Sequence, residues 1–188
     1  MPALIDHAAR RQHIIDATLD LVLTGGFAAV SLRKVATAAE LNIGSVRHCF
    51  ANRDALLIAT AEEVGRRMGT RLAGRSAQCD STATLRELVC ELLPLDDVRR
   101  RETVAIIELI IAARTEPVFA PVAEQMAQDL RDELSAALTR LGVEAPQETA
   151  GELSALISGL SLDAVTPHGR LQPAEMQTTL DHWLARLT

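Results

Sequence analysis

The chain has 188 residues, 48% of them hydrophobic and 2% aromatic, which is enough for one large or two small helical domains with a hydrophobic core. Its formal net charge of −6 argues against non-specific binding to a polyanion, because such binding requires an excess of basic residues. Nothing in this composition indicates a disordered chain.

The first predicted helix covers residues 7–24, with Ile14 and Leu21 on an apolar face. Gly25 and Gly26 are expected to end it, because glycine readily adopts the left-handed backbone conformation found after helix C-termini. We expect Phe27 to fill the small core of this N-terminal region.

Two short helices joined by a tight turn are predicted between residues 30 and 50. Ser31 and Asn42 are good N-cap residues for the first and the second of them. Apolar residues at helical spacing give the pair a buried face: Leu32, Val35, Ala36, Ala39, Ile43, Val46 and Phe50. This layout is that of a helix-turn-helix, and it predicts DNA binding.

The other face of the pair carries small, polar and cationic residues. Arg33 and Arg47 can each donate two hydrogen bonds to a guanine base, so we predict that they contact bases and determine sequence specificity. Other residues of the face suit phosphate contacts, which fix register without reading sequence. The full predicted set of DNA-binding residues is Ser31, Arg33, Lys34, Asn42, Ile43, Gly44, Ser45, Arg47, His48 and Arg53.

The distribution of charge supports this prediction. Residues 1–53 hold six arginine and lysine residues against four acidic ones, a net charge of +2 that leaves −8 for the remainder of the chain. A mildly basic N-terminal region on an acidic body is a modest indication of nucleic-acid binding. Dimerisation would double the local positive charge.

Four segments between residues 25 and 57 follow a known pattern: Gly25-Gly26-Phe27, Val30-Ser31-Leu32-Arg33, Gly44-Ser45-Val46-Arg47-His48-Cys49-Phe50 and Asn52-Arg53-Asp54-Ala55-Leu56-Leu57. They resemble the DNA-binding head of TetR-family transcriptional regulators. The resemblance implies a base contact for Arg33, a recognition helix containing Ile43, Gly44, Ser45 and Arg47, and phosphate contacts for His48 and Arg53. Glu40 departs from the pattern because the family commonly has glycine in the turn, where the left-handed backbone that the resemblance implies costs a non-glycine residue about 1 kcal/mol. Arg47 departs because an aromatic residue is frequent there.

Asn52 is a further N-cap, for a long helix predicted through Ala73 and followed by a loop from Gly74 to Ser81. Five more helices are predicted over residues 82–93, 96–114, 117–141, 146–165 and 173–187, with prolines at or near their boundaries. No segment alternates like a strand. The predicted fold is therefore all-α, with a three-helix DNA-binding head (1–52) followed by a six-helix ligand-binding and dimerisation domain (53–188).

The body contains no nucleophile motif, no phosphate-binding glycine-rich loop and no pair of histidines placed as metal ligands, so we predict no enzyme, no cofactor and no metal site. Its wide apolar helix faces can instead enclose a pocket. In the resembled family this region binds a small-molecule effector. The predicted pocket residues are Met68, Leu88, Leu92, Ile107, Glu108, Ile111, Phe119 and Met126, with ordinary core packing as the alternative for each.

Glu108 interrupts an apolar run from Val104 to Ala113. A carboxylate that faces inward there needs a partner. Our hypothesis is that Glu108 pairs with a cationic effector, or with an arginine that a ligand displaces. In the alternative it points to solvent or is held permanently by an internal arginine.

The last two predicted helices each keep an apolar stripe at a spacing of three to four residues. Two such helices from each of two chains would form a four-helix bundle, and the resembled family dimerises in this way. A two-fold dimer would present two recognition helices to a palindromic operator. The predicted dimer interface consists of Leu153, Leu156, Ile157, Leu160, Met176, Leu180, Trp183, Leu184 and Leu187, with packing on their own chain as the alternative.

The start of the chain lacks the residue order of a secretion signal, and no run approaches the length of about 18 apolar residues needed to span a bilayer. We therefore expect a cytoplasmic protein with no membrane partner. Cys49, Cys79 and Cys90 have no metal-ligand spacing and are most simply reduced thiols. A role for them in sensing oxidants stays open.

These features predict a sequence-specific DNA-binding transcriptional regulator, acting as a repressor that a small-molecule effector releases from its operator. An activator or a cysteine redox-gated regulator with the same head remains the alternative. The sequence identifies neither the effector nor the operator nor the regulated genes.

Overall fold

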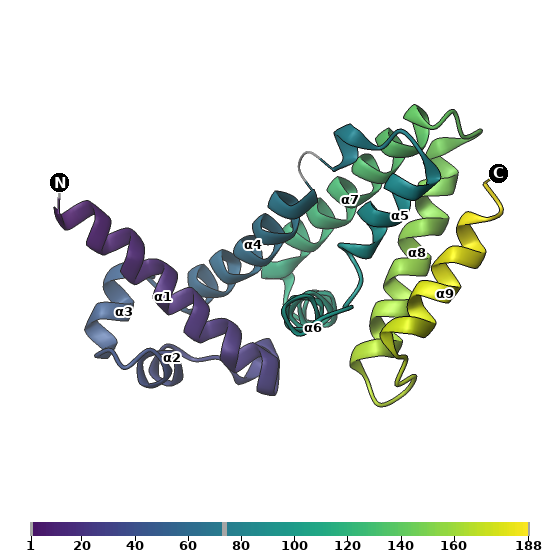
Figure 1. Cartoon of the computed structure of the whole chain (residues 1–188). Helices are drawn as coiled ribbons and strands as arrows, with labels where there is room; N and C mark the ends of the chain where they lie inside the picture. The colour runs from purple at the N-terminus through teal and green to yellow at the C-terminus, as the bar shows by residue number, and fades with distance from the viewer. Residues whose placement is uncertain (1, 73–74, 188) are drawn as a thin grey trace. The chain divides into compact units, whose positions relative to one another are not determined.

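The computed structural model describes residues 2–72 and 75–187, and for residues 2–6 it describes the backbone only. Every regular element in these ranges is helical, which confirms the predicted all-α class (Figure 1). No helix in the described ranges is both long and apolar enough to cross a bilayer. The α-helices are α1 (Pro2–Gly25), α2 (Leu32–Ala38), α3 (Ile43–Cys49), α4 (Arg53–Leu72), α5 (Thr82–Cys90), α6 (Asp97–Ala112), α7 (Ala120–Arg140), α8 (Pro146–Val165) and α9 (Pro173–Leu184), with short 3-10 helices η1 (Phe27–Ala29), η2 (Ser76–Gln78) and η3 (Pro117–Phe119).

Local chemistry sets the helix boundaries. The side chains of Ser31, Asn42 and Asn52 each accept a hydrogen bond from the backbone N–H three residues later, at 3.3, 2.8 and 2.8 Å, so all three predicted N-caps are confirmed. α5 ends at Cys90 rather than at the predicted residue 93, because Pro94 disfavours helical backbone in the residue before it. The predicted helix end at Ala73 and loop start at Gly74 lie outside the described residues.

The chain divides into two compact units. The N-terminal unit comprises Met1–Gly65 and Ala105–Ala123, and the C-terminal unit comprises Arg66–Val104 and Glu124–Thr188. α4 and α6 each contribute residues to both units. The N-terminal unit therefore contains more of the chain than the predicted head of residues 1–52, because the second half of α6 and η3 belong to it.

The core of the N-terminal unit joins these distant segments. Ile14, Val35 and Val46 from α1, α2 and α3 are completely buried. The ring of Phe27 packs edge-on against the ring of Phe119, with 4.7 Å between the ring centroids. Phe27 is thus a core residue as predicted, but its partner lies far along the chain.

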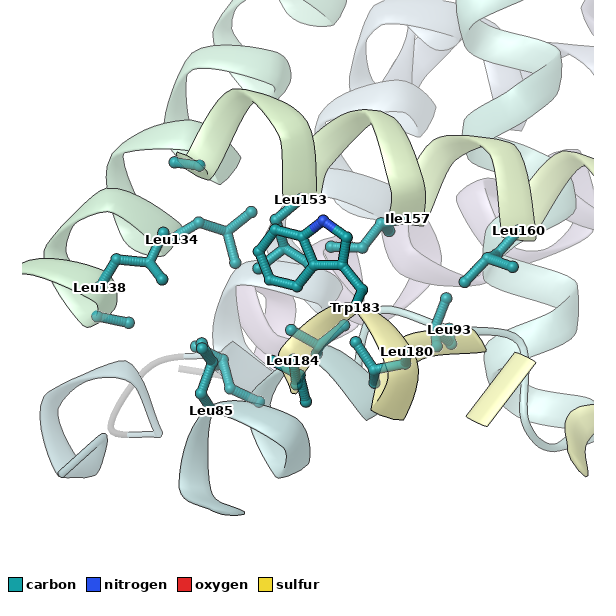
Figure 2. Close-up of a cluster of buried hydrophobic side chains, with 14 of the residues drawn as sticks. Leu85, Leu93, Leu134, Leu138, Leu153, Ile157, Leu160, Leu180, Trp183 and Leu184 are labelled. Carbon is teal, nitrogen blue, oxygen red and sulfur yellow. The ribbon is translucent and has the colours of Figure 1, made fainter. Parts of the chain in front are cut away.

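The core of the C-terminal unit is built mainly from leucines around a single tryptophan (Figure 2). Leu85 of α5, Leu138 of α7, Leu153 of α8 and Leu180 of α9 are fully buried, and Trp183 lies among them. A leucine-rich core explains how so aromatic-poor a sequence still buries enough apolar surface to fold.

Candidate nucleic-acid interface

The turn between α2 and α3 fixes how these two helices are arranged. The N–H of Leu41 donates to the carbonyl of Ala36 at 2.9 Å, and the N–H of Glu40 donates to the carbonyl of Thr37 at 3.2 Å. Glu40 has φ of 54°, so the left-handed conformation expected from the family resemblance is confirmed. A residue with a Cβ costs about 1 kcal/mol there, and the surrounding hydrogen bonds hold it in place.

The outer surface of α2 and α3 carries most of the predicted DNA-binding residues. Arg33, Lys34, Asn42, Gly44, Arg47 and His48 are exposed, and Ser31 and Ser45 are half-buried. Within the described residues, the guanidinium groups of Arg33 and Arg47 have no hydrogen-bond or ion-pair partner. Two arginines therefore stand at a polar surface with all their donors available for a ligand.

Ile43 corrects one detail of the sequence analysis. We expected it on the buried side of the second helix with Val46 and Phe50, and both of those are buried. Ile43, however, is 37% exposed in the first turn of α3. An apolar group at this position can contact the methyl group of thymine in a major groove.

Arg53 differs from Arg33 and Arg47 in being bound within the protein. It stands at the start of α4, where the resemblance implied a phosphate contact. Its Nε donates to the carbonyl of Val30 at 2.9 Å, Nη2 donates to the carbonyl of Phe27 at 2.9 Å, and Nη1 pairs with Glu116 at 2.8 Å. All three guanidinium nitrogens are thus engaged inside the N-terminal unit, because the extended backbone around Val30 leaves carbonyls that need donors.

Side chains of α1 support the interface, which the sequence analysis did not anticipate. The Arg11 guanidinium lies over the Phe50 ring, 4.4 Å from its centroid, and Nε2 of His13 hydrogen-bonds the carbonyl of Ala39 at 2.9 Å. The rings of His7 and His48 are in edge contact, with 5.6 Å between centroids. No local pattern signals these contacts, because each joins residues far apart in the sequence.

The eight predicted pocket residues divide between the two units. Ile107, Glu108, Ile111 and Phe119 belong to the N-terminal unit, and Met68, Leu88, Leu92 and Met126 belong to the C-terminal unit. Two of them are ordinary core residues: Phe119 is fully buried against Phe27, and Leu88 is buried in the leucine core. Met68 and Leu92 are partly buried against the same core, whereas Ile111 is 51% exposed.

Glu108 is half-buried, and its carboxylate lies at Gly26. A Cβ at position 26 would come within 2.5 Å of Oε2 of Glu108, and Gly26 has a positive φ of 66°. The positive φ is the main reason for glycine at position 26, since the end of the Glu108 side chain could move away from a Cβ. Among the described residues, the Glu108 carboxylate has no hydrogen-bond or ion-pair partner, so no internal arginine holds it, and its partial exposure leaves it in contact with solvent.

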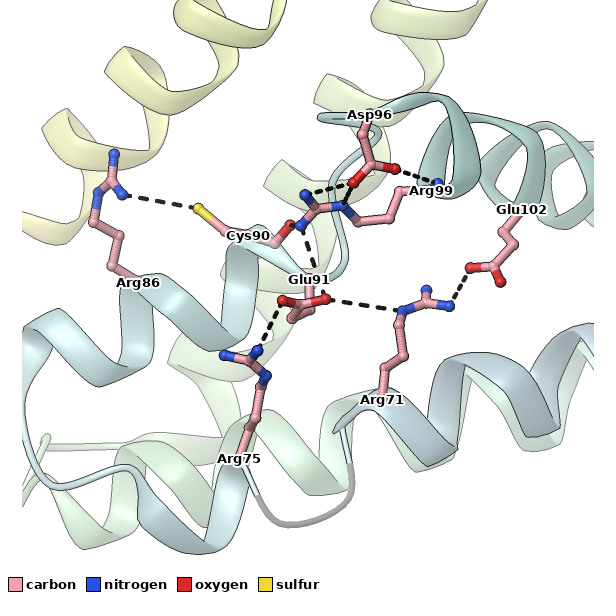
Figure 3. A network of polar contacts seen from close by, with 8 residues as sticks. All are labelled: Arg71, Arg75, Arg86, Cys90, Glu91, Asp96, Arg99 and Glu102. Carbon is pink, nitrogen blue, oxygen red and sulfur yellow. Dashed lines mark hydrogen bonds and ion pairs between the residues drawn. The ribbon is translucent and has the colours of Figure 1, made fainter.

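Two glutamates of the C-terminal unit, Glu91 and Glu102, are ion-paired (Figure 3). In the C-terminal unit, the Glu91 carboxylate forms ion pairs with three arginines. The nitrogen–oxygen distances are 3.1 Å to Arg75, 3.8 Å to Arg99 and 3.9 Å to Arg71. Arg71 also pairs with Glu102. These glutamates have arginine partners within the C-terminal unit, in contrast to Glu108.

The apolar stripes predicted for dimerisation pack within their own protomer. Leu153, Ile157, Leu160, Met176, Leu180, Trp183 and Leu184 are buried in the leucine core, and Leu156 and Leu187 are partly buried against it. Packing within the protomer, the alternative interpretation, therefore accounts for the seven buried residues, because each stripe covers the core that α5 and α7 leave open.

Two of the three cysteines, Cys79 and Cys90, lie where a reactive thiolate is disfavoured. Cys79 is buried, and burial raises the pKa of its thiol and that of Cys90, so the reactive thiolate is disfavoured at both. No cluster of three or more histidine, cysteine or acidic side chains suited to a metal ion occurs among the residues the structure describes.

A capped helix pair with free arginines on its outer surface, joined to a helical body, defines a helix-turn-helix protein of the all-α class. Residues 14–60 match the model of the tetR family of bacterial regulatory proteins, and residues 81–188 match the model of the BetI-type transcriptional repressor C-terminal domain. The second match covers more than half of the chain. The chain therefore belongs to the TetR family of transcriptional regulators, a family of regulators and not of enzymes.

Relatives and solved structures agree with this assignment. The chain is 36% identical over 88 residues to an HTH-type transcriptional regulator in the dhlA 5' region of Xanthobacter autotrophicus, covering 45% of this chain and 44% of that one. It is 29% identical over 165 residues to the HTH-type transcriptional regulator BetI of Burkholderia mallei, covering 86% and 85%. The chain spans less than half the length of the first curated relatives it matches.

Two solved structures share the fold. A transcriptional regulator from Rhodococcus sp. RHA1 has a TM-score of 0.86 at 26% identity, covering 94% of this chain and 95% of that one. The multidrug binding protein EbrR, complexed with proflavin, has a TM-score of 0.61 at 28% identity, covering 93% and 99%. TetR-family regulators bind DNA operators and small-molecule effectors and act as dimers.

Proposed function

We propose that this protein is a sequence-specific DNA-binding repressor that a small-molecule effector releases from its operator. The observation that carries the proposal is the pair of exposed, unpartnered arginines, Arg33 and Arg47, on a helix pair held by two side-chain caps. Such a pair can enter a major groove with little rearrangement, because the caps and the turn already fix the recognition helix.

Fluorescence anisotropy with DNA from upstream of the protein's own gene tests DNA binding. Specific, salt-dependent binding with a dissociation constant far below that for scrambled DNA supports the proposal. Equal affinity for both DNAs, and for other promoter fragments of the same genome, would overturn it.

The operator is palindromic in this proposal, because a two-fold dimer presents one recognition helix to each half-site, with half-site centres about 34–36 Å apart. The outer face of α8 supports a dimer. Ala155, Ser158, Gly159 and Leu162 are exposed at helical spacing, and Leu162 is a large apolar residue with 45% of its surface accessible. These residues replace the buried stripes as the proposed contact.

A Gly159→Arg variant tests this face by size-exclusion chromatography with light scattering. A Cβ at Gly159 meets no atom within 4 Å, so the substitution leaves the protomer intact but obstructs a partner on α8. We expect a monomer that loses specific operator binding. Gly69→Arg is the matched control, because Gly69 is also a helical glycine with open space around it; a dimeric Gly159→Arg protein would remove α8 from the interface.

The effector in this proposal is an organic cation. The half-buried Glu108 carboxylate without an ion-pair partner among the described residues supports this, because a buried negative charge is stabilised by a positive one. EbrR, which shares the fold, was solved with proflavin, a planar organic cation. Glu108 also lies at Gly26, where α1 ends, so charge at this carboxylate acts close to the DNA-binding helices.

Titration of the protein–operator complex with proflavin tests the effector class. We expect proflavin to lower operator affinity, and Glu108→Gln to weaken that response about 10-fold or more, since a charge-assisted contact is worth about 1.5–3 kcal/mol. Glu124→Gln, at an exposed position on α7, is the control for a general loss of negative charge. An unchanged response in Glu108→Gln would end the role of this carboxylate.

A further inference from the structure

A cleft of about 550 Å³ opens in the C-terminal unit where the connection from α5 to α6 meets the connection from α8 to α9. Its volume lies in the range of about 300–1,000 Å³ that is usual for small-molecule sites. None of the eight predicted effector residues lines it, and neither does any residue of the α2–α3 surface. The cleft is thus a separate feature of the molecule.

The cleft contains a distinctive set of charges. Arg100 donates from Nη1 to the carbonyl of Ala164 at 2.7 Å, which holds its guanidinium at the cleft while Nε and Nη2 have no partner among the described residues. Arg170, on the α8–α9 connection, is exposed, and within the described ranges its guanidinium has no partner either. Two guanidinium groups, one from the first turns of α6 and one from the α8–α9 connection, thus line one space, an arrangement suited to a carboxylate.

The cleft also holds two aspartates, and only one of them is engaged. Asp96 accepts hydrogen bonds from the backbone N–H and from Nε of Arg99, both at 2.8 Å, and so is neutralised locally. Asp97 has no hydrogen-bond or ion-pair partner among the described residues. A pure anion would meet repulsion from Asp97, whereas a ligand with an ammonium group beside its carboxylate would satisfy both signs.

The remaining wall of the cleft is apolar and stiff. Leu95, Val165, Leu171 and Met176 supply the hydrophobic surface. Pro94, Pro167 and Pro173 fix the backbone at three points around the opening, and this reduces the ordering cost of binding.

We infer that this cleft binds a zwitterionic small molecule with an aliphatic body, of the chemical class of the branched-chain α-amino acids. The carboxylate lies between Arg100 and Arg170, the ammonium faces Asp97, and the aliphatic side chain lies on Leu95 and Leu171. This site is additional to the DNA surface and to the proposed effector contact at Glu108.

Isothermal titration calorimetry on the full chain with three matched probes tests the inference. Leucine carries both charges, 4-methylpentanoate lacks the ammonium, and leucinamide lacks the carboxylate. We expect leucine to bind and each single-charge probe to bind at least about 10-fold more weakly. The absence of leucine binding at millimolar concentration, or equal binding of all three probes, would overturn the assignment.

Single substitutions test which charged side chain of the cleft binds the carboxylate of the ligand and which binds its ammonium group. Arg170→Asn suits the positive φ of 52° at this position, since asparagine tolerates left-handed backbone, and it should weaken leucine about 10-fold while leucinamide is unaffected. Asp97→Asn should weaken leucine and leave 4-methylpentanoate unchanged or tighter. Arg131→Gln, an exposed arginine on α7 outside the cleft, is the control; equal losses in Arg131→Gln and Arg170→Asn would refute a specific site.

Discussion

Two groups of arginines in the N-terminal unit show how much context decides the role of a basic residue. On the α2–α3 surface, Arg33 and Arg47 are exposed and have no partner among the described residues. Arg53, six residues after Arg47, donates hydrogen bonds from its guanidinium group to two backbone carbonyls and to the Glu116 carboxylate. Proximity to a helix-turn-helix therefore does not by itself leave an arginine's donors free for DNA. The deciding factor is whether nearby acceptors in the fold need its donors.

The largest expected effect concerns the exposed pair. An Arg33→Ala/Arg47→Ala protein should lose operator affinity by about 100-fold or more, since each bidentate contact with a base is worth about 1–3 kcal/mol. Its thermal unfolding should match that of the parent chain, because both side chains are exposed and neither makes a hydrogen bond or ion pair among the described residues. Anisotropy titrations beside an Arg131→Ala control measure this. Full affinity in the double variant would remove the α2–α3 surface from DNA recognition.

Arg53 should show the opposite behaviour. Arg53→Gln leaves the carbonyls of Phe27 and Val30 without their donors and Glu116 without its pair, so we expect the free energy of unfolding in urea to fall by about 2 kcal/mol. The salt dependence of operator binding should stay the same. In Lys34→Gln, by contrast, the slope of log affinity against log salt should fall by about one, with stability unchanged. A reduced slope and unchanged stability in Arg53→Gln would make Arg53 the phosphate contact that the family resemblance implied.

The difference between these arginines also marks what sequence could and could not predict. The caps at Ser31, Asn42 and Asn52 and the left-handed Glu40 depend on residues within three positions of each other, and all were predicted. The same holds for the bounds of α8, which begins at Pro146. Local chemistry fixes such features before any tertiary contact forms.

Contacts between distant segments were not predictable in this way. Phe119 looks like a pocket residue in the sequence, but it packs on Phe27 because the segment after α6 joins the N-terminal unit. An apolar stripe such as that of Leu153 and Leu180 can pack equally well on its own chain or on a partner, because the hydrophobic effect has no directional preference. Only the fold distinguishes these possibilities.

A substitution at Glu40 tests the strain in the turn between α2 and α3. Replacing Glu40 with glycine removes the Cβ strain of the left-handed turn, and it also removes a negative charge near the proposed phosphate contacts. We expect the free energy of unfolding to rise by about 1 kcal/mol and operator affinity to increase modestly. Ala38→Gly is the matched control, because glycine in the helical backbone of α2 should destabilise by about the same amount. If both variants lose stability, the strain at Glu40 is absent.

The smallest expected effect extends the comparison to an exposed arginine of the C-terminal unit. Arg86 of α5 holds Asp181 of α9 through two hydrogen bonds, at 2.5 and 3.1 Å, and this hydrogen bonding lowers the pKa of the Asp181 carboxyl. Both side chains are more than one third exposed, so solvent screening limits the pair to within about 1 kcal/mol. Arg86 should therefore matter less for stability than Arg53, although both are paired.

The pH dependence of the free energy of unfolding of the Asp181→Asn variant distinguishes an electrostatic contribution of this ion pair from a contribution by packing. Because the folded pKa lies below the unfolded value, the stabilisation is present above the ordinary aspartate pKa of about 3.9 and is lost as the pH falls through the folded pKa. Urea unfolding should show a small deficit of the variant at neutral pH that shrinks below about pH 4 and in high salt. Glu152→Gln, which removes an exposed carboxylate from α8, should show no such change. A deficit that is constant across pH would mean that Asp181 acts through packing and that Arg86 contributes no net electrostatic stabilisation.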